Sequence, residues 1–258
     1  LGLDPGVAAE FDLGQVPENR WEVWEGLQAL RIDMVVQSAE GRKKRLLIAD
    51  MDSTMIHQEC IDELADEAGV GARVADITSR AMNGELDFEA ALRERVGLLK
   101  GLPEGVIAKV LRDRITLMPG GETLLKTMKA NGGHAALVSG GFTAFTAEVA
   151  RRLGFDETRA NTLLVKAGVL LGSVADPILG KEAKLQALNE ISARLGITPG
   201  QAIAVGDGAN DLPMLQAAGT GVALHAKPRV QAECAVRVNH GDLTALLYLQ
   251  GYAREEFA

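Results

Sequence analysis

The feature that most constrains this chain is a short apolar run that ends in two acidic residues. Residues 46–49 are Leu-Leu-Ile-Ala, and Asp50 and Asp52 follow with one methionine between them. A continuous apolar run of this length predicts a strand that is buried on both faces, as in a parallel sheet covered by helices. Residues two apart in an extended backbone point the same way, so both carboxylates are expected to face one site beyond the strand end. Taken alone, the stretch also fits a strand followed by a polar turn, because Asp, Ser and Thr are common turn residues.

Two later apolar runs end in the same manner. Residues 135–138 lead into Ser139-Gly140-Gly141, and residues 202–205 lead into Gly206-Asp207-Gly208-Ala209-Asn210-Asp211. Because the carboxyl ends of parallel strands meet at one edge of a sheet, all three turns are expected to converge. Four carboxylates at close range repel one another unless a cation balances them. The candidate ligands are hard oxygen atoms, which favours Mg²⁺ over zinc, and the glycines let backbone N–H groups approach an anion.

Four helical patterns lie between the first and second of these strands, which a plainly alternating α/β chain would not contain. Apolar residues recur at helical spacing over residues 61–70, 74–82, 88–99 and 105–114. We therefore expect an α/β fold with a doubly wound, mostly parallel sheet (a Rossmann-like core) over residues 46–57 and 116–258. A helical-bundle cap is expected as an insert over residues 58–115, and a β-hairpin over residues 161–171 with its turn near Ala167 and Gly168.

The first 45 residues are interpreted as part of a small α/β module followed by a linker. A helical pattern covers residues 21–30 and a strand pattern covers residues 32–36. The chain begins at Leu1 rather than Met, so we expect that the natural N-terminus is missing. The role of this segment, and whether the protein is a monomer or a homodimer, stay open.

The composition excludes some classes of function. Hydrophobic residues make up 47% of the chain, charged residues 24%, and the formal net charge is −8. This balance is ordinary for a soluble globular protein and gives no electrostatic footprint for nucleic acid, although a local site can still be positive. No apolar run approaches the roughly 18 residues that span a bilayer, and no signal-peptide pattern opens the chain. We expect a cytoplasmic protein without membrane contact, in which Cys60 and Cys234 are buried thiols in a reducing compartment.

Together the motifs resemble the haloacid dehalogenase-type phosphohydrolase superfamily. Its pattern is an Asp-x-Asp-x-Thr strand end, a Ser or Thr strand end, a Lys and a final Asp-rich strand end, all of which occur here in that order. Further motifs are similar to those of the phosphoserine phosphatases within the superfamily: Met82-x-Gly84-x-x-Asp87-Phe88, Leu92-Arg93-Glu94-Arg95-Val96, Val138-Ser139-Gly140-Gly141-Phe142 and Ala226-Lys227-Pro228. The resemblance covers about residues 46–250 and leaves out the N-terminal segment.

The resemblance implies a Mg²⁺-dependent phosphatase that acts through an aspartyl-phosphate intermediate. Asp50 would be the nucleophile, and Asp52 the general acid for the leaving group and then the base for water. The metal would be held by Asp50, by the backbone carbonyl of Asp52 and by Asp207. Asp211 would support these ligands from behind.

The resemblance also implies phosphate-binding groups at the other strand ends. Ser139, Gly140 and Asn210 would contact phosphate or substrate, because the oxygens of the transferring group carry the charge of the transition state. The family's lysine has two candidates on one helix. We favour Lys181, because the apolar residues that follow then fall where the family's helix places them. Lys184 is interpreted as a solvated helix lysine.

The implied substrate is O-phospho-L-serine, hydrolysed to L-serine and phosphate in the last step of serine biosynthesis. Its ammonium and carboxylate groups require an acid and an arginine. Glu59 resembles the family's amine-binding glutamate, and Arg95 its carboxylate-binding arginine, for which bidentate geometry fits. Met82 and Phe88 either line the closed pocket or pack in the core.

Other functions are compatible with part of the sequence. A phosphatase or phosphotransferase for another small phosphomonoester, such as phosphothreonine or phosphoglycolate, would use the same core motifs. A phospho-receiver domain also phosphorylates an aspartate near a lysine and a Ser or Thr, but it needs neither a second acid nor a cap. A catalytically inactive binding protein would be expected to lack motif residues, and none is missing here.

Overall fold

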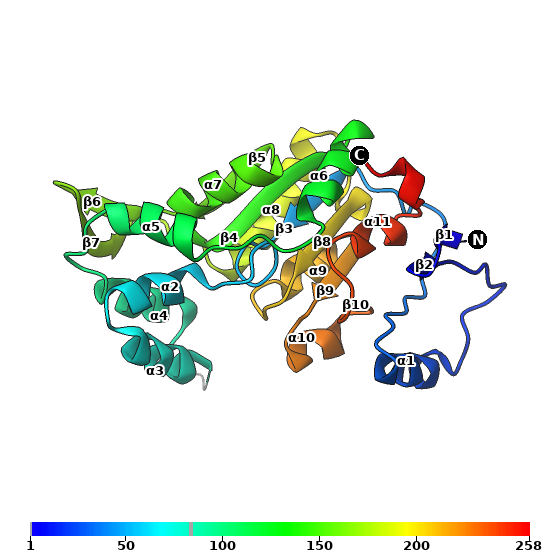
Figure 1. Ribbon diagram of the computed structural model, residues 1–258, viewed down its shortest axis with the longest axis horizontal. Coiled ribbons are helices and arrows are strands. Elements are labelled where there is room, and N and C mark those ends of the chain that lie inside the picture. Colours follow the sequence, from blue (N-terminus) through cyan, green and yellow to red (C-terminus); the bar gives the residue numbers. More distant parts are fainter. Residues whose placement is uncertain (1, 83–84) are drawn as a thin grey trace.

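A six-stranded parallel sheet forms the centre of the computed structural model, which describes residues 2–82 and 85–258 and, among these, the side chains of all but residues 81, 82 and 181 (Figure 1). In spatial order its strands are β10 (Val236–Val238), β9 (Thr220–Leu224), β8 (Ala202–Gly206), β3 (Leu46–Ala49), β4 (His134–Phe142) and β5 (Glu157–Asn161). The chain builds β3, β4 and β5 in one direction and then crosses to β8 on the other side of β3. The topological switch point, where ligands bind in such sheets, therefore lies between β3 and β8.

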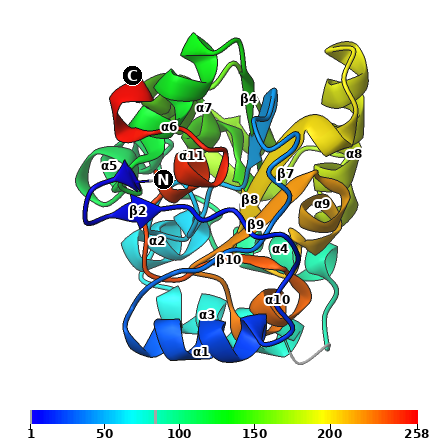
Figure 2. The ribbon, with the colours of Figure 1, turned by 90° about the vertical axis from the view of Figure 1, so that its right-hand side faces the viewer.

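Helices cover both faces of the sheet (Figure 2). One face is covered by α6 (Gly121–Ala130), α7 (Thr143–Leu153) and α11 (Ala245–Leu249), and the other by α8 (Lys181–Arg194), α9 (Leu212–Ala217) and α10 (Pro228–Glu233). Leu47 and Ala49 of β3 face the first group, and Leu46 and Ile48 face the second. All four side chains are fully buried, which explains the continuous apolar run and confirms the doubly wound α/β core. Two 3-10 helices, η1 (Pro199–Gln201) and η2 (Arg254–Glu256), precede β8 and follow α11.

The predicted helical insert is present. It contains α2 (Cys60–Glu67), α3 (Gly71–Met82), α4 (Phe88–Gly97) and α5 (Gly105–Asp113). Helices α2 to α4 form a lobe at the left of Figure 1, and α5 leads back to α7 of the core. The two segments that join the lobe to the core lie side by side. His57 donates its backbone N–H to the carbonyl of Thr116 at 3.1 Å, and the Gln58 side chain makes two hydrogen bonds of 2.9 Å with Thr116.

The predicted hairpin is formed by β6 (Leu163–Lys166) and β7 (Val169–Val174), which pair antiparallel outside the main sheet. Its turn residues Ala167 and Gly168 have φ values of 51° and 75°. Positive φ at both positions is what a two-residue type I′ turn requires. The hairpin adds to the lobe, because Gly101 donates its N–H to the carbonyl of Leu170 at 2.9 Å, and Leu170 donates its own to Leu102 at 2.8 Å.

The N-terminal segment packs beside the carboxyl-terminal part of the chain. It contains β1 (Gly2–Asp4), β2 (Ala8–Ala9) and α1 (Arg20–Ala29), so the helix predicted over residues 21–30 is confirmed. The strand predicted over residues 32–36 is wrong, because these residues are all described and pair with no other strand. The Asp33 carboxylate instead accepts the backbone N–H groups of Asn239, His240 and Gly241 at 2.8 to 2.9 Å. A loop on the core therefore holds this segment in place of a neighbouring strand.

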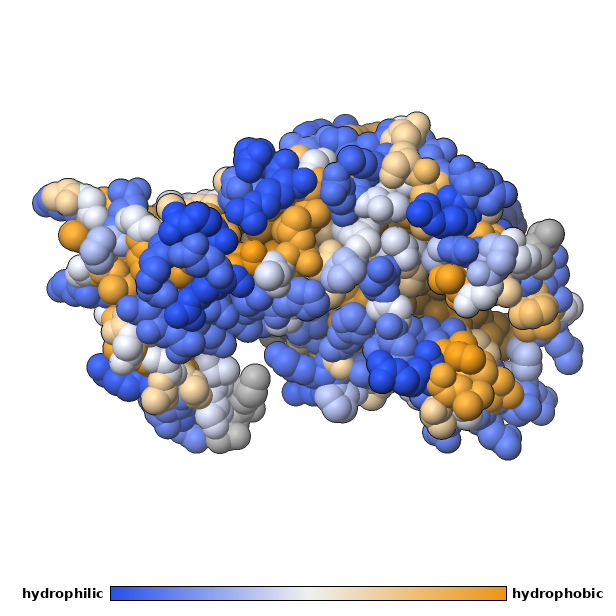
Figure 3. Space-filling model, in the orientation of Figure 1, coloured by the Kyte–Doolittle hydropathy of each residue, from blue (hydrophilic) through white to orange (hydrophobic). Residues whose placement is uncertain are grey.

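Figure 3 shows an apolar patch at the lower right, where α1 lies in Figure 1. None of the residues of α1, all of which are described, is buried, and the side chains of Trp21 and Val23 are exposed. The guanidinium of Arg237 lies 4.6 Å from the ring centroid of Trp21 and 5.0 Å from that of Trp24, within the range of a cation–π contact. Among the helices in the described ranges, none has the length and apolar character to cross a membrane.

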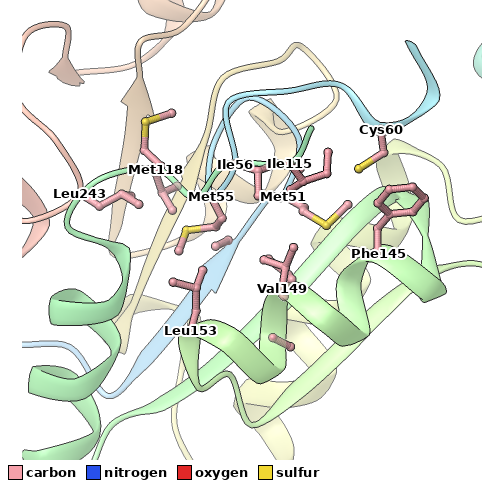
Figure 4. Packing of buried hydrophobic residues seen from close by; sticks show 14 of the residues in the cluster. Met51, Met55, Ile56, Cys60, Ile115, Met118, Phe145, Val149, Leu153 and Leu243 are labelled. Carbon is pink, nitrogen blue, oxygen red and sulfur yellow. The ribbon is translucent and has the colours of Figure 1, made fainter. Parts of the chain in front are cut away.

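A buried apolar cluster lies beneath the turn that follows β3 (Figure 4). Met51 extends from that turn toward Phe145 on α7, and Met55 extends toward Leu153 on the same helix. Met51 has no exposed surface and lies between the two acidic residues of the opening motif. Because Met51 is anchored in the core, the flanking Asp50 and Asp52 face the opposite way and line a cavity.

Candidate active site

The carboxyl ends of β3, β4 and β8 meet the lobe around a cavity of about 180 Å³. The core contributes Asp50, Asp52, Gly140, Gly141, Phe142, Asp207, Gly208, Asn210 and Lys227 to its wall. The lobe and its connecting segment contribute Glu59, Ile61, Phe88, Leu92 and Arg95. The structure thus brings most of the predicted site residues to one place, between an α/β core and a helical lobe.

Asp50 lies at the end of β3 and is 6% exposed. Its backbone N–H donates to the carbonyl of Val205 at 3.0 Å, which continues the pairing of β3 with β8. Its Oδ1 accepts the N–H of Met51 at 2.8 Å and lies 2.7 Å from the ammonium of Lys184. Burial raises the pKa of Asp50 well above its usual value and the charge of Asp211 raises it further, whereas the charge of Lys184 lowers it.

Asp52 faces the same cavity from the next turn. Its Oδ1 accepts the backbone N–H of Cys60 at 2.8 Å, and its Oδ2 accepts the hydroxyl of Ser139 at 3.2 Å. A Cβ atom on Gly141 would lie 2.7 Å from that Oδ2, so a larger residue there would displace the carboxylate. Burial raises the pKa of Asp52, and the hydrogen bonds from Cys60 and Ser139 oppose this shift. A carboxyl group that keeps its proton to higher pH is suited to general acid catalysis.

An acidic cluster marks the place where a metal ion could bind. Asp50, Asp207 and Asp211 are all buried, and each offers a carboxylate oxygen within 4.8 Å of the others. Burial raises the pKa of Asp207 and the charge of Asp211 adds to this effect, while the hydroxyl of Thr54 donates to Asp207 Oδ1 at 3.2 Å. The donors of this cluster are carboxylate oxygens, which fit a hard cation and not a thiolate-preferring or imidazole-preferring one.

Asp211 differs from its two neighbours because both of its oxygens already have partners. Its Oδ1 accepts the ammonium of Lys184 at 2.5 Å, and its Oδ2 accepts the N–H of Gly208 at 3.0 Å. A Cβ atom on Gly206 would collide with the Asp211 side chain, so glycine is required where β8 ends. These contacts suit a residue that orients the others, as the sequence predicts.

Lys184 lies against the acidic cluster, and its interpretation as a solvated lysine is wrong. The residue is 2% exposed, and its ammonium contacts both Asp50 and Asp211. Burial lowers the pKa of Lys184, but the two carboxylates outweigh burial and raise it overall. Lys181 is the first residue of α8, and its side chain lies outside the described part of the structure. A sequence signal existed, because Lys184 precedes the buried Leu188 by one helical turn and so shares its face.

Ser139 and Gly140 lie within β4, which continues to Phe142, so the turn predicted at residues 139–141 is wrong, although both residues do lie in the carboxyl-terminal half of the strand. Ser139 is buried, and its Oγ accepts the N–H of Gly141 at 2.9 Å. Gly140 and Asn210 line the cavity, where backbone and amide groups can reach an anion. Lys227 also lines it, although its Ala-Lys-Pro motif carries no assigned role in the sequence analysis. The position of this exposed cation beside an acidic cavity depends on the fold and could not be predicted from the sequence.

Glu59 and Arg95 form the wall on the side of the lobe. Glu59 Oε1 accepts the hydroxyl of Ser53 at 2.7 Å. Glu59 as a whole is exposed, but desolvation of its carboxyl beside the cavity and the charge of Asp52 raise its pKa to about 7. Arg95 on α4 is partly buried, its Nη1 lies 3.5 Å from the hydroxyl of Thr78, and burial lowers its pKa. An acid and an arginine on one wall suit a ligand with both an ammonium and a carboxylate.

Met82 and Phe88 are expected either to line the pocket or to pack in the core, and the structure describes the side chain of Phe88. The ring of Phe88 lines the cavity, and a Cβ atom on Gly140 would lie 3.2 Å from it. The side chain of Met82 and the whole of Gly84 in the same motif lie outside the described residues.

Comparison with known proteins shows the family to which the chain belongs. Residues 47–216 match the family model of haloacid dehalogenase-like hydrolases. The chain belongs to this family. A phosphoserine phosphatase from a Polaromonas species is 48% identical to this hydrolase over 210 residues, which cover 80% of the chain and 89% of the relative. A phosphoserine phosphatase from Streptomyces coelicolor is 44% identical over 260 residues, which cover 99% of the chain but 63% of the relative.

A solved structure supports the same relationship. The phospho-aspartyl intermediate analogue of a phosphoserine phosphatase superposes on this hydrolase with a TM-score of 0.74 at 42% identity, covering 80% of the chain and 98% of that structure. The likeness to phosphoserine phosphatases therefore extends over most of the chain. The Streptomyces relative matches the N-terminal segment as well.

Proposed function

We propose that this hydrolase converts O-phospho-L-serine to L-serine and inorganic phosphate, the last step of serine biosynthesis. The observation that carries the proposal is one cavity whose core wall holds Asp50 and Asp52 and whose lobe wall holds Glu59 and Arg95. The first pair suits phosphoryl transfer through an enzyme carboxylate. The second pair suits the ammonium and carboxylate of an amino acid.

Asp50 is the proposed nucleophile. Both contacts that described residues make with its carboxylate fall on Oδ1, which the Met51 N–H and the Lys184 ammonium hold in place. Oδ2 is then the oxygen that attacks phosphorus, in line with the bond to the serine oxygen. As the new P–O bond forms, the bond to serine breaks, and an aspartyl-phosphate results.

Asp52 is the proposed proton donor and acceptor. Its raised pKa keeps a proton available for the serine oxygen as that oxygen leaves. The resulting carboxylate then accepts a proton from the water that attacks the aspartyl-phosphate, which releases phosphate and restores Asp50. Ser139, Gly140 and Asn210 are proposed to contact the phosphoryl oxygens during both steps.

Lys184 takes the role that the sequence analysis gave to Lys181. Its buried ammonium already touches the proposed nucleophile, so it can reach a phosphoryl group bound there. A fixed positive charge in a buried site stabilises the oxygens of the transferring group without reorganisation.

Mg²⁺ is the cation that we propose for the acidic cluster. Asp50, Asp207 and the backbone carbonyl of Asp52 would hold it, and Asp211 would orient these groups. When bound, the ion supplies positive charge that offsets the carboxylates and polarises the phosphoryl group.

Residues 58–115 are proposed to act as a cap over the core of residues 46–57 and 116–258, with residues 1–45 as a separate segment. Closing a cap of this kind excludes bulk water and brings specificity groups to the substrate. Cys60 and Cys234 are free and buried, which fits the cytoplasmic location that we propose.

Three matched substrates test the assignment: phosphoserine, phosphoethanolamine, which lacks the carboxylate, and 3-phosphooxypropanoate, which lacks the amine. Phosphate release is measured for each with Mg²⁺ and with a chelator. We expect phosphoserine to exceed each analogue in kcat/KM by about tenfold or more, since one lost charged contact is worth about 1.4 kcal/mol or more. Chelation is expected to abolish turnover of all three.

Two variants assign the advantage to particular groups. Glu59→Gln is expected to remove the preference over the amine-free analogue, and Arg95→Lys the preference over phosphoethanolamine, because lysine lacks the planar fork. Equal rates on all three substrates in the unmodified protein would contradict phosphoserine as the substrate. That result would favour a phosphatase for another small phosphomonoester, such as phosphoglycolate.

A further inference from the structure

Asn161 is a buried polar residue that the mechanism above does not use. It is the last residue of β5, the strand beside β4, and it is 2% exposed. In the pairing of these strands it lies opposite Phe142, the last residue of β4, which directly follows Ser139, Gly140 and Gly141. A polar side chain buried at this depth must find hydrogen-bond partners inside the protein.

The side-chain amide of Asn161 binds two segments that both lead into the site. Its Nδ2 donates to the carbonyl of Gly140 at 2.8 Å and to that of Leu179 at 3.4 Å, and its Oδ1 accepts the N–H of Leu179 at 2.8 Å. Gly140 lies in β4 and lines the cavity. Leu179 lies two residues before α8, the helix that carries Lys184. One side-chain amide thus holds together β4 and the segment before α8, both of which contribute groups to the site.

The bond to Gly140 continues as a chain of hydrogen bonds to Asp52. The carbonyl of Gly140 and the N–H of Gly141 belong to the same planar peptide group, so holding the carbonyl also orients the N–H. That N–H donates to Ser139 Oγ at 2.9 Å, and the Ser139 hydroxyl donates to Asp52 Oδ2 at 3.2 Å. Each hydrogen bond is donated in the same direction, from the amide of Asn161 toward the carboxylate. Hydrogen bonds arranged in such a chain polarise one another.

We propose that Asn161 is a positioning residue for phosphoryl transfer. It fixes the peptide between Gly140 and Gly141, and through Ser139 it sets the orientation of Asp52. It also holds the segment before α8 against this part of β4. The inference rests on the proposed function for the role of Asp52 as general acid. Rotation of that one peptide would remove the hydrogen-bond donor from Ser139 and release the proton donor from its place.

Two variants and two leaving groups test this role. Asn161→Asp keeps the shape of the side chain but replaces the Nδ2 donor with an oxygen, and Asn161→Ser is too short to reach Gly140. Steady-state kinetics with Mg²⁺ are measured on phosphoserine and on p-nitrophenyl phosphate. The serine oxygen needs a proton as it leaves, whereas p-nitrophenolate leaves without one.

The expected result is a loss that depends on the leaving group. For both variants we expect kcat/KM on phosphoserine to fall by about 30-fold and kcat/KM on p-nitrophenyl phosphate by less than about fivefold, because kcat/KM reports the formation of the aspartyl-phosphate and only the serine oxygen needs the acid in that step. The hydrolysis of the aspartyl-phosphate is common to both substrates, so kcat alone does not separate them. The matched control is Asn131→Asp, since the Asn131 amide only donates to the Thr127 carbonyl at 2.9 Å at the end of α6. This control is expected to affect both substrates equally and by less than about twofold.

Equal losses on the two substrates, or no loss in either variant, would overturn the proposal, since a purely structural role does not distinguish leaving groups. Thermal unfolding shows whether each variant is folded. If Asn161→Asp does not fold, Asn161→Ser decides, because it adds no charge to the buried position. Failure of the unmodified protein to hydrolyse phosphoserine would contradict the proposed function alone. In that case, the positioning role is tested by comparing the loss on phosphoethanolamine, used as the alkyl phosphate, with the loss on p-nitrophenyl phosphate.

Discussion

Lys184 shows how strongly burial determines the chemistry of a single side chain. A lysine on a helix surface contributes little, but this ammonium is 2% exposed and contacts two carboxylates. Lys184→Gln is expected to lower kcat by about 10³-fold, because the variant loses a fixed charge at the reacting group. Lys181→Gln, at the start of the same helix, is expected to lose far less activity. Phosphate release at saturating Mg²⁺ measures both, and a larger loss for Lys181→Gln would restore the original assignment.

Asp50 is expected to become covalently phosphorylated during turnover. Asp50→Asn should reduce phosphate release by about 10⁴-fold or more, because an amide oxygen is a poor nucleophile. Mass spectrometry of acid-quenched reactions is expected to find one added phosphoryl group on the unmodified protein and none on Asp50→Asn. Asp52→Asn is the matched control, since it is slowed at proton transfer but keeps the nucleophile. Near-normal turnover by Asp50→Asn would rule out covalent catalysis at this residue.

The contact between the β6–β7 hairpin and the lobe depends on Gly172. This residue has a φ of 71°, and a Cβ atom there would lie 2.7 Å from Cβ of Lys100. Gly172→Ala is therefore expected to lower the free energy of unfolding by about 2 to 3 kcal/mol, from backbone strain and from steric overlap together. Gly168→Ala is the control. Its φ of 75° is similar, but nothing lies within 4 Å of the added atom, so about 1 kcal/mol is expected.

Urea unfolding followed by circular dichroism compares the two glycine variants. Equal destabilisation would mean that the contact with Lys100 adds nothing to the strain. A larger effect of Gly172→Ala would show that hairpin and lobe are stabilised as one unit.

The elements that the sequence predicts best are those with a local pattern. The strand at residues 46–49, the hairpin turn at Ala167 and Gly168 and the helices of the insert all follow from short-range periodicity or turn chemistry. Residues 32–36 have a strand pattern as well, but a strand also needs a partner, and Asp33 binds a loop in its place. Propensity alone could not show this, because the partner comes from the far end of the chain.

The same limit applies to the site. The aspartates and glycines could be placed from the sequence because each directly follows a predicted strand, and parallel strands end at one edge. Lys184 could not be placed in this way, because its contacts with Asp50 and Asp211 involve two other elements. The hydrogen bonds of Asn161 to Gly140 and Leu179 likewise exist only once three segments have assembled.

At the scale of the whole molecule, metal binding is expected to be linked to stability and pH. Burial raises the pKa values of Asp50 and Asp207, so in the metal-free protein these carboxyls hold protons more tightly when folded than when unfolded. Stability that is present below their unfolded pKa values, about 3.9, is therefore lost as pH rises toward the raised values. A cation that binds the ionised carboxylates reverses this loss.

We therefore expect Mg²⁺ to raise Tm more at about pH 7.5 than at about pH 5.5, where protons compete with the metal. Thermal unfolding with Mg²⁺ and with a chelator measures the difference at each pH. Asp207→Asn should remove most of the Mg²⁺ effect at the higher pH. An identical shift at the two pH values would contradict the coupling between protons and metal at these carboxylates.

The ammonium of Lys184 also enters the charge balance of the acidic cluster, and with it the valence of the ion that we propose there. When ionised, Asp50, Asp207 and Asp211 carry three negative charges, and the Lys184 ammonium, which contacts Asp50 and Asp211, offsets one of them, so two remain. A divalent cation cancels them, whereas a monovalent ion leaves a negative charge where the dianionic phosphate must enter. A trivalent ion would leave a surplus positive charge that binds phosphate and retains it after hydrolysis. We therefore expect the site to prefer a divalent ion because of a lysine that need not touch the metal.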